Sequence, residues 1–448
     1  AVTPDDTIPL EIDDITSQGS GVGRSPTGRA VFVPRTVPGD HVLARITRER
    51  TSWARADLVE VVEASPDRRI APCALYDRCG GCQIQHVRYG RQVAWKADRI
   101  REALARIGGI ELDEIEVEPS ESEYGYRNRV SFTLKRLGSG RVLAGYHERD
   151  RPGRIVDVHD ECLLPEAAIG PVWTELRAKW GGRAERLPAG RQLRLTLRAV
   201  EDGVVLVVEG GHPGNDDSRR AGELIEGIGD LLAIWHRPEK AERPLLLAGE
   251  PSVRDRWFGE ELALESSAFL QVNREGAHAV HRSVLGELGN PEGLRIVDAY
   301  AGVAGYGRRL ARHGAEVVAI ESDPVAARMA RTDAPDGLVV VEGRVEDRLA
   351  DHLPADRVVL NPPRTGVDEA VTGALLDASA SRLVYVSCDP ATLARDLERL
   401  SDRYVVRRVR GFDLFPQTAH VETVVTLDAR ADGPASAVDA GDDPPSTS

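Results

Sequence analysis

The chain has 448 residues, 41% of them hydrophobic, and a formal net charge of −14. This length exceeds one ordinary domain and predicts two to four domains, with enough apolar residues for a core. The acidic balance excludes a uniformly basic nucleic-acid coat protein, and no apolar run reaches membrane-spanning length.

Residues 1–66 are predicted to form a small β-barrel. Glycine and proline turns, among them residues 19–23 and 38–40, separate short apolar runs at residues 8–15, 30–33, 42–46 and 54–62, about five strands in all. Five strands in this length fit a barrel of the OB type, whose exposed face commonly binds oligonucleotides. Seven arginines are interleaved with these runs and favour RNA over a barrel without a ligand: Arg24, Arg29, Arg35, Arg45, Arg48, Arg50 and Arg55.

Residues 67–260 are predicted to form an α+β central domain. Apolar residues recur at helical spacing over residues 91–107, and strand-like runs follow at residues 130–134, 193–200 and 203–209. Residues 127–154 contain eight Lys or Arg against Glu148 and Asp150. This second cationic stretch is either a solvated face or part of an RNA-binding surface.

Four of the five cysteines lie in this central region. Cys73, Cys79 and Cys82 follow a Cys-x5-Cys-x2-Cys spacing, and Cys162 comes eighty residues later. The first residues are acidic and do not match a signal peptide, so we expect a cytoplasmic protein whose cysteines are metal ligands or nucleophiles rather than disulfides. Four thiolates suit zinc or an iron–sulfur cluster, and the three-plus-one spacing favours a 4Fe-4S cluster over zinc.

Residues 261–428 alternate strands with helices, which predicts an α/β fold with a doubly wound parallel sheet. The expected strands are residues 295–298, 316–321, 337–341, 357–360 and 383–386. Residues 429–448 are rich in Pro and Asp and are predicted to be disordered.

The first strand of this region leads into a glycine-rich loop. It ends at Asp298, and Gly302, Gly305 and Gly307 follow before a helix. Glycines let a nucleotide approach the backbone closely, and Glu321, about twenty residues on, is placed to accept hydrogen bonds from ribose hydroxyls. The pattern predicts a nucleoside cofactor and leaves a dinucleotide and S-adenosylmethionine open.

The end of the fourth strand favours S-adenosylmethionine. Asn361, Pro362, Pro363 and Arg364 follow that strand. Asn-Pro-Pro followed by an aromatic residue is typical of methyltransferases that modify exocyclic amino groups. Because position 364 is arginine, that target is disfavoured and a carbon atom becomes the alternative.

Cys388 closes the last parallel strand, before an Asp-Pro turn. Carbon 5 of a pyrimidine is a poor nucleophile, so an enzyme adds a thiolate at carbon 6 and later removes the carbon-5 proton with a base. We predict Cys388 as the nucleophile, with a pKa lowered by the following helix, and Glu422, at the start of another strand, as the base. The alternative for Cys388 is a packed structural thiol.

Three motifs together resemble the signature of the S-adenosylmethionine-dependent RNA uracil-C5 methyltransferases, of the type that acts on 23S ribosomal RNA. They are NPPRTGVD (residues 361–368), YVSCDPATLARDL (385–397) and HVETVVTL (420–427). SSAFLQVN (266–273) and YGYRNRVSF (124–132) match further family segments, and the barrel resembles a TRAM domain. The resemblance covers nearly the whole chain except the tail.

This resemblance implies a Rossmann-like methyltransferase domain, Cys388 as nucleophile, Glu422 as base, and a structural, RNA-positioning 4Fe-4S cluster on the four central cysteines. The implied partner is RNA, with ribosomal RNA favoured over transfer RNA, and we expect a monomer without membrane contact. The implied cofactor-binding residues are Gln271, Asp298, Tyr300, Gly302, Gly305, Glu321, Asp347 and Asn361.

Asn361 departs from the family pattern, which usually has aspartate there. The glycine loop AYAGVAGYG and Asp389 after the cysteine depart as well. These departures leave open a non-catalytic iron–sulfur RNA-binding protein on a methyltransferase fold.

Overall fold

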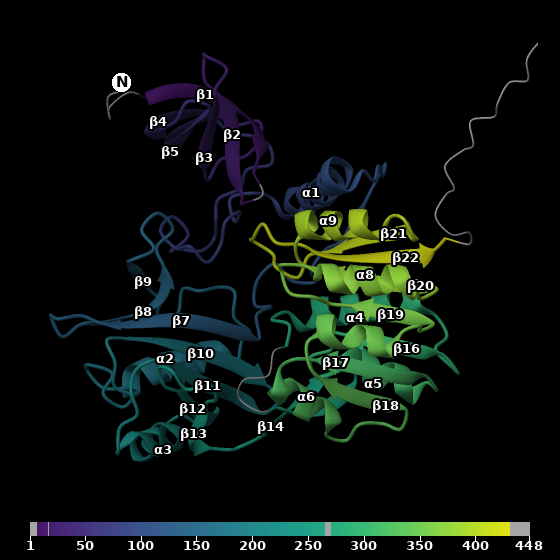
Figure 1. Cartoon of the computed structure of the whole chain (residues 1–448). Coiled ribbons are helices and arrows are strands. Elements are labelled where there is room, and N and C mark those ends of the chain that lie inside the picture. Colours follow the sequence, from purple (N-terminus) through teal and green to yellow (C-terminus); the bar gives the residue numbers. More distant parts are fainter. Residues whose placement is uncertain (1–6, 17, 265–269, 431–448) are drawn as a thin grey trace, which may run out of the picture.

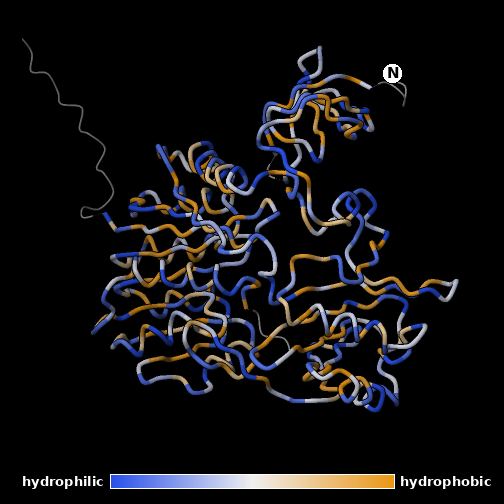
Figure 2. The backbone as a smooth tube through the Cα atoms, turned by 180° about the vertical axis from the view of Figure 1, so that it is seen from behind, coloured by the Kyte–Doolittle hydropathy of each residue, from blue (hydrophilic) through white to orange (hydrophobic). Residues whose placement is uncertain are grey.

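The computed structural model describes residues 7–16, 18–264 and 270–430, which form a barrel, a central sheet and a larger sheet with helices on both faces (Figure 1). Apolar stretches lie mainly along the strands and the inner faces of the helices (Figure 2). None of the helices in the described ranges is both long enough and apolar enough to cross a membrane. The predicted disorder of residues 429–448 falls outside the described residues, apart from Ala429 and Arg430.

The amino-terminal strands close into a barrel of the predicted OB type. Their order is β1-β2-β3-β5-β4, and β1 pairs with both β2 and β4. Alternate side chains such as Ile12, Val31 and Ala44 fill the interior, as expected for half-buried strands. The bounds are β1 (Thr7–Ile15), β2 (Ser20–Arg24), β3 (Ala30–Pro34), β4 (His41–Glu49) and β5 (Trp53–Glu63).

The central region is an α+β layer, as predicted. Seven strands in the order β13-β12-β11-β10-β7-β8-β9 pair antiparallel except for β11 with β12, and α2 (Ile169–Lys179) and α3 (Asp217–Gly227) contribute to the same core. The strands are β7 (Arg129–Arg136), β8 (Val142–His147), β9 (Ile155–Asp157), β10 (Gln192–Val200), β11 (Gly203–Glu209), β12 (Leu231–Arg237) and β13 (Leu245–Gly249). A separate hairpin, β14 (Val253–Trp257) and β15 (Glu260–Leu264), leads toward the larger sheet.

The larger sheet has eight strands in the order β18-β17-β16-β19-β20-β22-β21-β6. Its five parallel strands lie where the sequence predicted them: β16 (Arg295–Ala299), β17 (Glu316–Glu321), β18 (Leu338–Glu342), β19 (Arg357–Leu360) and β20 (Arg382–Ser387). The sheet is not wholly parallel, because β22 (Glu422–Ala429) runs antiparallel between β20 and β21 (Tyr404–Phe412). This confirms the predicted doubly wound, Rossmann-like sheet and adds an antiparallel edge whose position in the sheet the sequence analysis did not predict.

Helices cover both faces of this sheet. One face packs against α4 (Arg274–Leu288), α5 (Gly305–Arg312) and α6 (Pro324–Arg331). The other packs against α7 (Val345–Arg348), the 3-10 turn η1 (Leu349–His352), α8 (Glu369–Asp377) and α9 (Pro390–Leu400). The alternation of strand and helix produces these layers because each sheet face is apolar and must be covered.

Two elements that precede the central sheet in sequence belong structurally to the larger one. Helix α1 (Tyr89–Gly108) packs on α9 through Ile100 and Leu104, and β6 (Glu116–Glu118) pairs with β21 at the sheet edge. Residues 89–118, which the sequence analysis assigned to the central domain, therefore pack with the larger sheet. They connect the cysteine segment directly to it.

Candidate active site and cysteine cavity

Cys388 and Glu422 lie at the same end of two paired strands. In the antiparallel register of β20 and β22, Ser387 is opposite Thr423, so the next residue of β20 faces the residue before Thr423. Glu422 is 3% exposed and Cys388 is half-buried. The sheet thus brings together the two residues predicted as nucleophile and base.

The thiol of Cys388 does not have the lowered pKa that the sequence analysis predicted. Burial and the charge of Glu422 raise its pKa, and Arg364 opposes them. The expected help from the α9 amino terminus is weakened because Asp389 already caps that helix, accepting a hydrogen bond from the Thr392 N–H at 2.9 Å. A carboxylate at the cap offsets the positive end of the helix dipole, so the free protein holds Cys388 as a thiol.

Glu422 has the character of a base that works near neutral pH. Burial raises its pKa to about 7, and the charge of Arg364 opposes this shift. A carboxyl group with a pKa in this range can accept a proton and release it again at physiological pH. The position of Glu422 at the start of a buried strand accounts for the shift.

Arg364 is the charged group shared by this site. It is exposed and follows the two prolines after β19, at the same sheet edge as Cys388. Its charge acts on Cys388 and Glu422 and lowers the pKa of His420, which burial and its cationic neighbours bring to about 4. The sequence analysis treated Arg364 only as a departure from another motif, although its place after a parallel strand was the available signal.

The glycine loop after β16 has the bonds of a nucleotide-binding turn. Glu321, at the end of β17, accepts a hydrogen bond from the Gly302 N–H at 2.7 Å, and Gly302 adopts a left-handed φ of 57°. Asp298 is fully buried and accepts from the Gly307 N–H at 2.9 Å, and burial raises its pKa to about 7. Asp298 therefore holds the loop through a buried hydrogen bond to Gly307, while Glu321 holds it through the bond to Gly302.

Gly305 begins α5 in close contact with the hairpin. A Cβ atom at Gly305 would lie 2.8 Å from the Phe258 ring, so a larger residue would displace the hairpin. Tyr300, with φ of 61°, is half-buried against the apolar core on the α8 and α9 face. The glycine loop is therefore held by the hairpin at Gly305 and by the apolar core at Tyr300.

The remaining predicted cofactor residues lie at the same edge with fewer contacts. Asn361 follows β19 and its N–H donates to the Ala299 carbonyl at 3.3 Å. Asp347 is exposed on α7, after β18. Gln271 joins the central domain through its carbonyl, which accepts from Asn128 Nδ2 at 3.0 Å. Part of the neighbouring SSAFLQVN segment, residues 266–269, lies outside the described residues.

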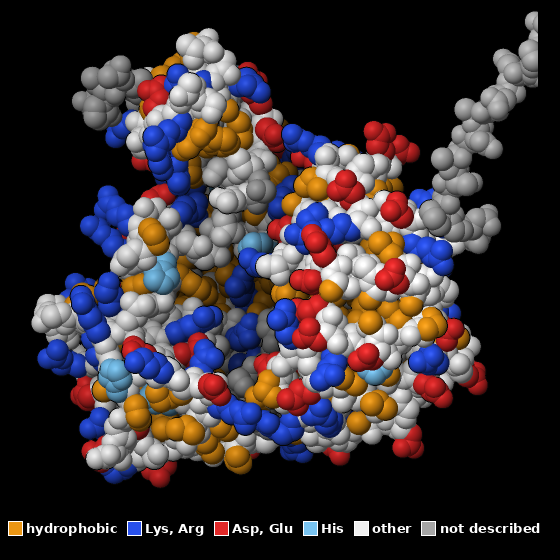
Figure 3. All heavy atoms as spheres, in the orientation of Figure 1, with side chains coloured by type: hydrophobic (Ala, Val, Ile, Leu, Met, Phe, Trp, Pro, Cys, Tyr) orange, Lys and Arg blue, Asp and Glu red, His pale blue; other side chains and the backbone are white. Residues whose placement is uncertain are grey.

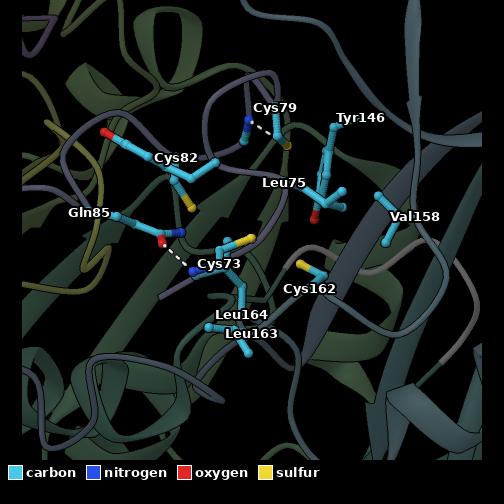
Figure 4. Close-up of a pocket in the computed structure, with 12 residues that line it drawn as sticks. Cys73, Leu75, Cys79, Cys82, Gln85, Tyr146, Val158, Cys162, Leu163 and Leu164 are labelled. Atoms are coloured by element: carbon cyan, nitrogen blue, oxygen red, sulfur yellow. Dashed lines mark hydrogen bonds between the residues drawn. The ribbon is translucent and has the colours of Figure 1, made fainter. Parts of the chain in front are cut away.

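The four central cysteines line one cavity, although they come from distant parts of the sequence (Figure 4). The space between its lining atoms is about 350 Å³, and Leu75, Tyr146 and Val158 contribute to its walls. The Tyr146 hydroxyl is buried and has no hydrogen-bond partner among the described residues. The fold thus gathers Cys73, Cys79, Cys82 and Cys162 as the spacing predicted.

The cysteines surround a space rather than a single point. No group of three or more His, Cys, Asp or Glu side chains in the described ranges is arranged to hold a metal ion. Burial, together with the neighbouring thiols, raises the pKa of Cys82 to about 11 and that of Cys162 to about 12. Arg149 holds the segment by donating to the Cys82 carbonyl at 2.7 Å.

Comparisons with known proteins agree with this geometry. Residues 341–430, which include Asn361, Cys388 and Glu422, match the family model described as tRNA (Uracil-5-)-methyltransferase, and residues 2–59 match the TRAM domain. An RNA methyltransferase of Nostoc sp. is 32% identical over 94% of this chain and 96% of its own length, and one of Halalkalibacterium halodurans is 31% identical over 96% and 98%. The chain belongs to the uracil-C5 RNA methyltransferase family.

A solved structure of an RNA methyltransferase is similar to this chain over nearly its whole length. Pyrococcus abyssi tRNA (uracil-54, C5)-methyltransferase, in complex with S-adenosyl-L-homocysteine, superposes with a TM-score of 0.73 at 26% identity, covering 94% of this chain and 99% of that one. The protein is thus an RNA methyltransferase. This favours an enzyme over a non-catalytic RNA-binding protein.

The cationic stretch of this RNA methyltransferase divides into structural and exposed residues. Arg136 donates to the Ala184 carbonyl at 2.7 Å, and Arg127 lies over the Tyr126 ring at 5.6 Å. Arg149 and Lys135 also donate to backbone carbonyls, Lys135 to Gly153 at 3.1 Å, so four of the eight cations contact the fold itself. Arg141, Arg151 and Arg154 are exposed.

A groove between the barrel and the central sheet adds to this surface. It has about 1120 Å³ of space between its lining atoms, with Pro34 and Arg55 on the barrel side and His147 and Arg149 on the other. The face in Figure 3 is hollowed between the central domain and the methyltransferase sheet, and Lys and Arg side chains gather along the hollow. A polyanion fits such a path because cations along a groove track a phosphate backbone.

Proposed function

We propose that the protein transfers a methyl group from S-adenosylmethionine to carbon 5 of a uridine in RNA, through a transient bond between Cys388 and carbon 6. The observation that carries this proposal is the placement of Cys388 and Glu422 at adjoining ends of β20 and β22, with the charge of Arg364 acting on both. A nucleophile and a separate base at one sheet edge are the two groups that carbon-5 methylation requires.

The proposed reaction proceeds in three steps. The Cys388 thiol loses its proton to solvent, and Sγ bonds to carbon 6 while the electron pair of the C5–C6 double bond moves toward the carbon-4 carbonyl oxygen. Carbon 5 then takes the methyl group of the sulfonium, whose carbon–sulfur bond breaks and leaves its electron pair on sulfur. Glu422 accepts the carbon-5 proton, the C5–C6 double bond forms again, and the bond to Sγ breaks to return the thiolate.

The chain's own residues position the cofactor. Gly302, whose Cβ position is open, leaves the nucleoside room at the backbone, and Glu321 is placed for the ribose hydroxyls. Gly305 belongs to the same loop, and Asn361, which follows β19, is assigned to the cofactor pocket. We assign Gln271, Tyr300 and Asp347 to the same pocket, and Asp298 to the support of its loop.

We assign a 4Fe-4S cluster to Cys73, Cys79, Cys82 and Cys162. The support for this assignment is that the four thiols line one cavity and that three closely spaced cysteines with a fourth farther along the chain form a common ligand set for such a cluster. The cluster would supply four iron–sulfur bonds that tie the segment of Cys73 to Cys162, and the methyl transfer needs no redox step from it.

The proposed substrate is large-subunit ribosomal RNA, bound by the barrel and the exposed arginines while the target uridine is turned out of its stack. Transfer RNA is the second candidate, because the similar Pyrococcus abyssi enzyme is named for it. That enzyme aligns over 94% of this chain, so the barrel itself does not distinguish the two RNAs.

Mass mapping of 5-methyluridine tests the proposal. Ribosomal and transfer RNA from a strain lacking this protein should miss the modification at one site, and the purified protein with S-adenosylmethionine should restore it. Loss confined to transfer RNA would replace the ribosomal assignment with the second candidate. An unchanged modification map, or methylation at another atom, would refute the proposed reaction.

A further inference from the structure

The loop that delivers Glu422 is held by distant parts of the chain. Residues 413–421 connect β21 to β22, and their backbone carbonyls accept hydrogen bonds from side chains of helix α1, the central domain and the segment before α4. These bonds are Asn273 Nδ2 to Leu414 O at 3.2 Å, Lys96 Nζ to Phe415 O at 3.2 Å, Tyr126 Oη to Pro416 O at 2.9 Å, and Arg99 to Ala419 O. The loop is thus fixed from outside its own sheet.

An ion pair fixes the start of this loop. Lys96 and Asp413 are both fully buried, and Nζ lies 2.5 Å from Oδ1. Burial lowers the pKa of Lys96, and Asp413 opposes that shift. Losing either partner would leave a buried charge without compensation.

Gln417 is the centre of the loop. It is fully buried and has a left-handed φ of 68°. Its Oε1 accepts hydrogen bonds from Arg69 and from Gln92 Nε2, each at 3.0 Å, and its Nε2 donates to Glu123 Oε2 at 3.1 Å. Its own N–H donates to Gln92 Oε1 at 3.0 Å.

The Gln417 carbonyl binds the cysteine segment. It accepts from the N–H groups of Gln83 and Ile84, at 2.9 and 3.2 Å. These two residues directly follow Cys82, which lines the cysteine cavity. Gln417 therefore joins that cavity to the loop that ends at Glu422, five residues farther along the chain.

We propose that Gln417 is a positioning residue that couples the cysteine segment to Glu422, and through it controls removal of the carbon-5 proton. The inference rests on the proposed function, since it assigns the base role to Glu422. Cys388 directly follows β20, which is held by the parallel strand β19 on one side as well as by β22 on the other, whereas Glu422 directly follows the loop. A displaced loop therefore slows the step that needs Glu422 and spares the bond between Sγ and carbon 6.

The test measures two rates on the same RNA. Unmodified ribosomal RNA from the deletion strain is mixed with S-adenosylmethionine and Gln417→Ala protein in a single turnover, and the denaturation-resistant RNA–protein adduct is followed on a gel. We expect adduct formation close to that of the unaltered protein and resolution about 10- to 100-fold slower, the cost of a misplaced reacting group. Resolution at the unaltered rate, or an equal loss in both rates, would overturn the coupling.

Gln417→Asn covers the case in which the alanine variant fails to fold. Asparagine tolerates a left-handed φ, but its side chain is one methylene shorter and does not reach Arg69 and Glu123. It should show the same slow resolution. His236→Ala is the matched control, because His236 is also buried and bonds the Gly210 carbonyl at 2.9 Å, within the central domain. It should lower thermal stability and leave the ratio of the two rates unchanged.

A second pair of variants tests the cysteine segment itself. Gln83→Pro removes the N–H that donates to Gln417, whereas Gln83→Ala keeps it. The proline variant should share the slow adduct resolution and the alanine variant should not, with iron content measured in both. Equal resolution rates in the two variants would contradict the proposed link.

The outcomes separate this inference from the function on which it rests. If the unaltered protein forms no adduct with any unmodified RNA, the uridine mechanism is wrong. If it forms and resolves one while the Gln417 variants behave identically to it, only the coupling is wrong.

Discussion

The protein uses cysteine in two buried places, and the surroundings give the thiols different chemistry. In the cysteine cavity, three other thiols act on Cys162, whereas Arg127 and two thiols act on Cys82. At the sheet edge, Cys388 has a carboxyl group and an arginine instead. Burial raises the pKa in both places, so burial alone does not distinguish a ligand from a nucleophile. The partner groups do, because a set of thiols favours a metal centre and a thiol beside a base favours covalent catalysis.

The largest expected difference between the two places is in activity. Cys388→Ala should reduce methyl transfer to RNA by at least about 10⁴-fold, because the nucleophile is removed. Binding of S-adenosylmethionine, measured by calorimetry, should remain, since Cys388 is not part of the glycine loop. If the variant methylates RNA at an undiminished rate, Cys388 is a packed structural thiol and not the nucleophile.

Removal of the base should slow the loss of the carbon-5 proton and leave the addition of Cys388 to carbon 6 intact. Glu422→Gln should slow turnover by about 10²- to 10⁴-fold, the usual contribution of a general base. It should also accumulate a denaturation-resistant RNA adduct, which a gel shift detects, because Cys388 still adds to carbon 6. Cys388→Ala is the control that should form none, and rapid turnover without an adduct would contradict the base role.

A ligand substitution in the cavity should act on stability. Cys162→Ser should lower iron content and, if cluster affinity falls a thousandfold, reduce the free energy of unfolding by about 4 kcal/mol. Thermal unfolding and iron analysis of the purified protein measure both effects. Cys388→Ser makes the same sulfur-to-oxygen change at the sheet edge and should leave iron content and the free energy of unfolding unchanged. Equal effects from the two serine variants would contradict the assignment of Cys162, and not Cys388, as a cluster ligand.

The smallest expected effect is a pH-dependent stabilisation at Glu422. Its folded-state pKa is raised to about 7 by burial, so folding favours the protonated form. The stability that this proton contributes is complete below about pH 4.5 and is lost as the pH rises through 7. Glu422→Gln has no charge to bury and should be more stable than the unaltered protein at pH 8, by up to ~3 kcal/mol.

Denaturant unfolding at pH 8 and pH 4.5 tests this effect. The difference between the two proteins should nearly disappear at the lower pH. A variant that is less stable than the unaltered protein at pH 8 would show that the Glu422 carboxylate is compensated by its surroundings.

The sequence predicted the fold well where local patterns were sufficient. Alternating strands and turns identified the barrel, and the repeated strand, glycine loop and helix identified the methyltransferase sheet, because burial on both faces makes such strands apolar. The antiparallel β22 next to β20 was not predicted, since strand order depends on distant pairing. The lowered pKa expected for Cys388 was wrong, because burial and the charge of Glu422 raise its pKa and the capping Asp389 weakens the effect of the helix terminus.

Residue types and their spacing thus determined which groups are available: five cysteines, an acid at a strand end, and a glycine loop. Only the tertiary structure decided which of them meet. It placed Glu422 beside Cys388 through a strand inserted out of sequence order, gathered Cys162 with three cysteines far from it, and buried Gln417 between the cavity and the base. These contacts join residues up to hundreds of positions apart, and no local propensity encodes them, because they arise from the packing of apolar faces that bring whole elements together.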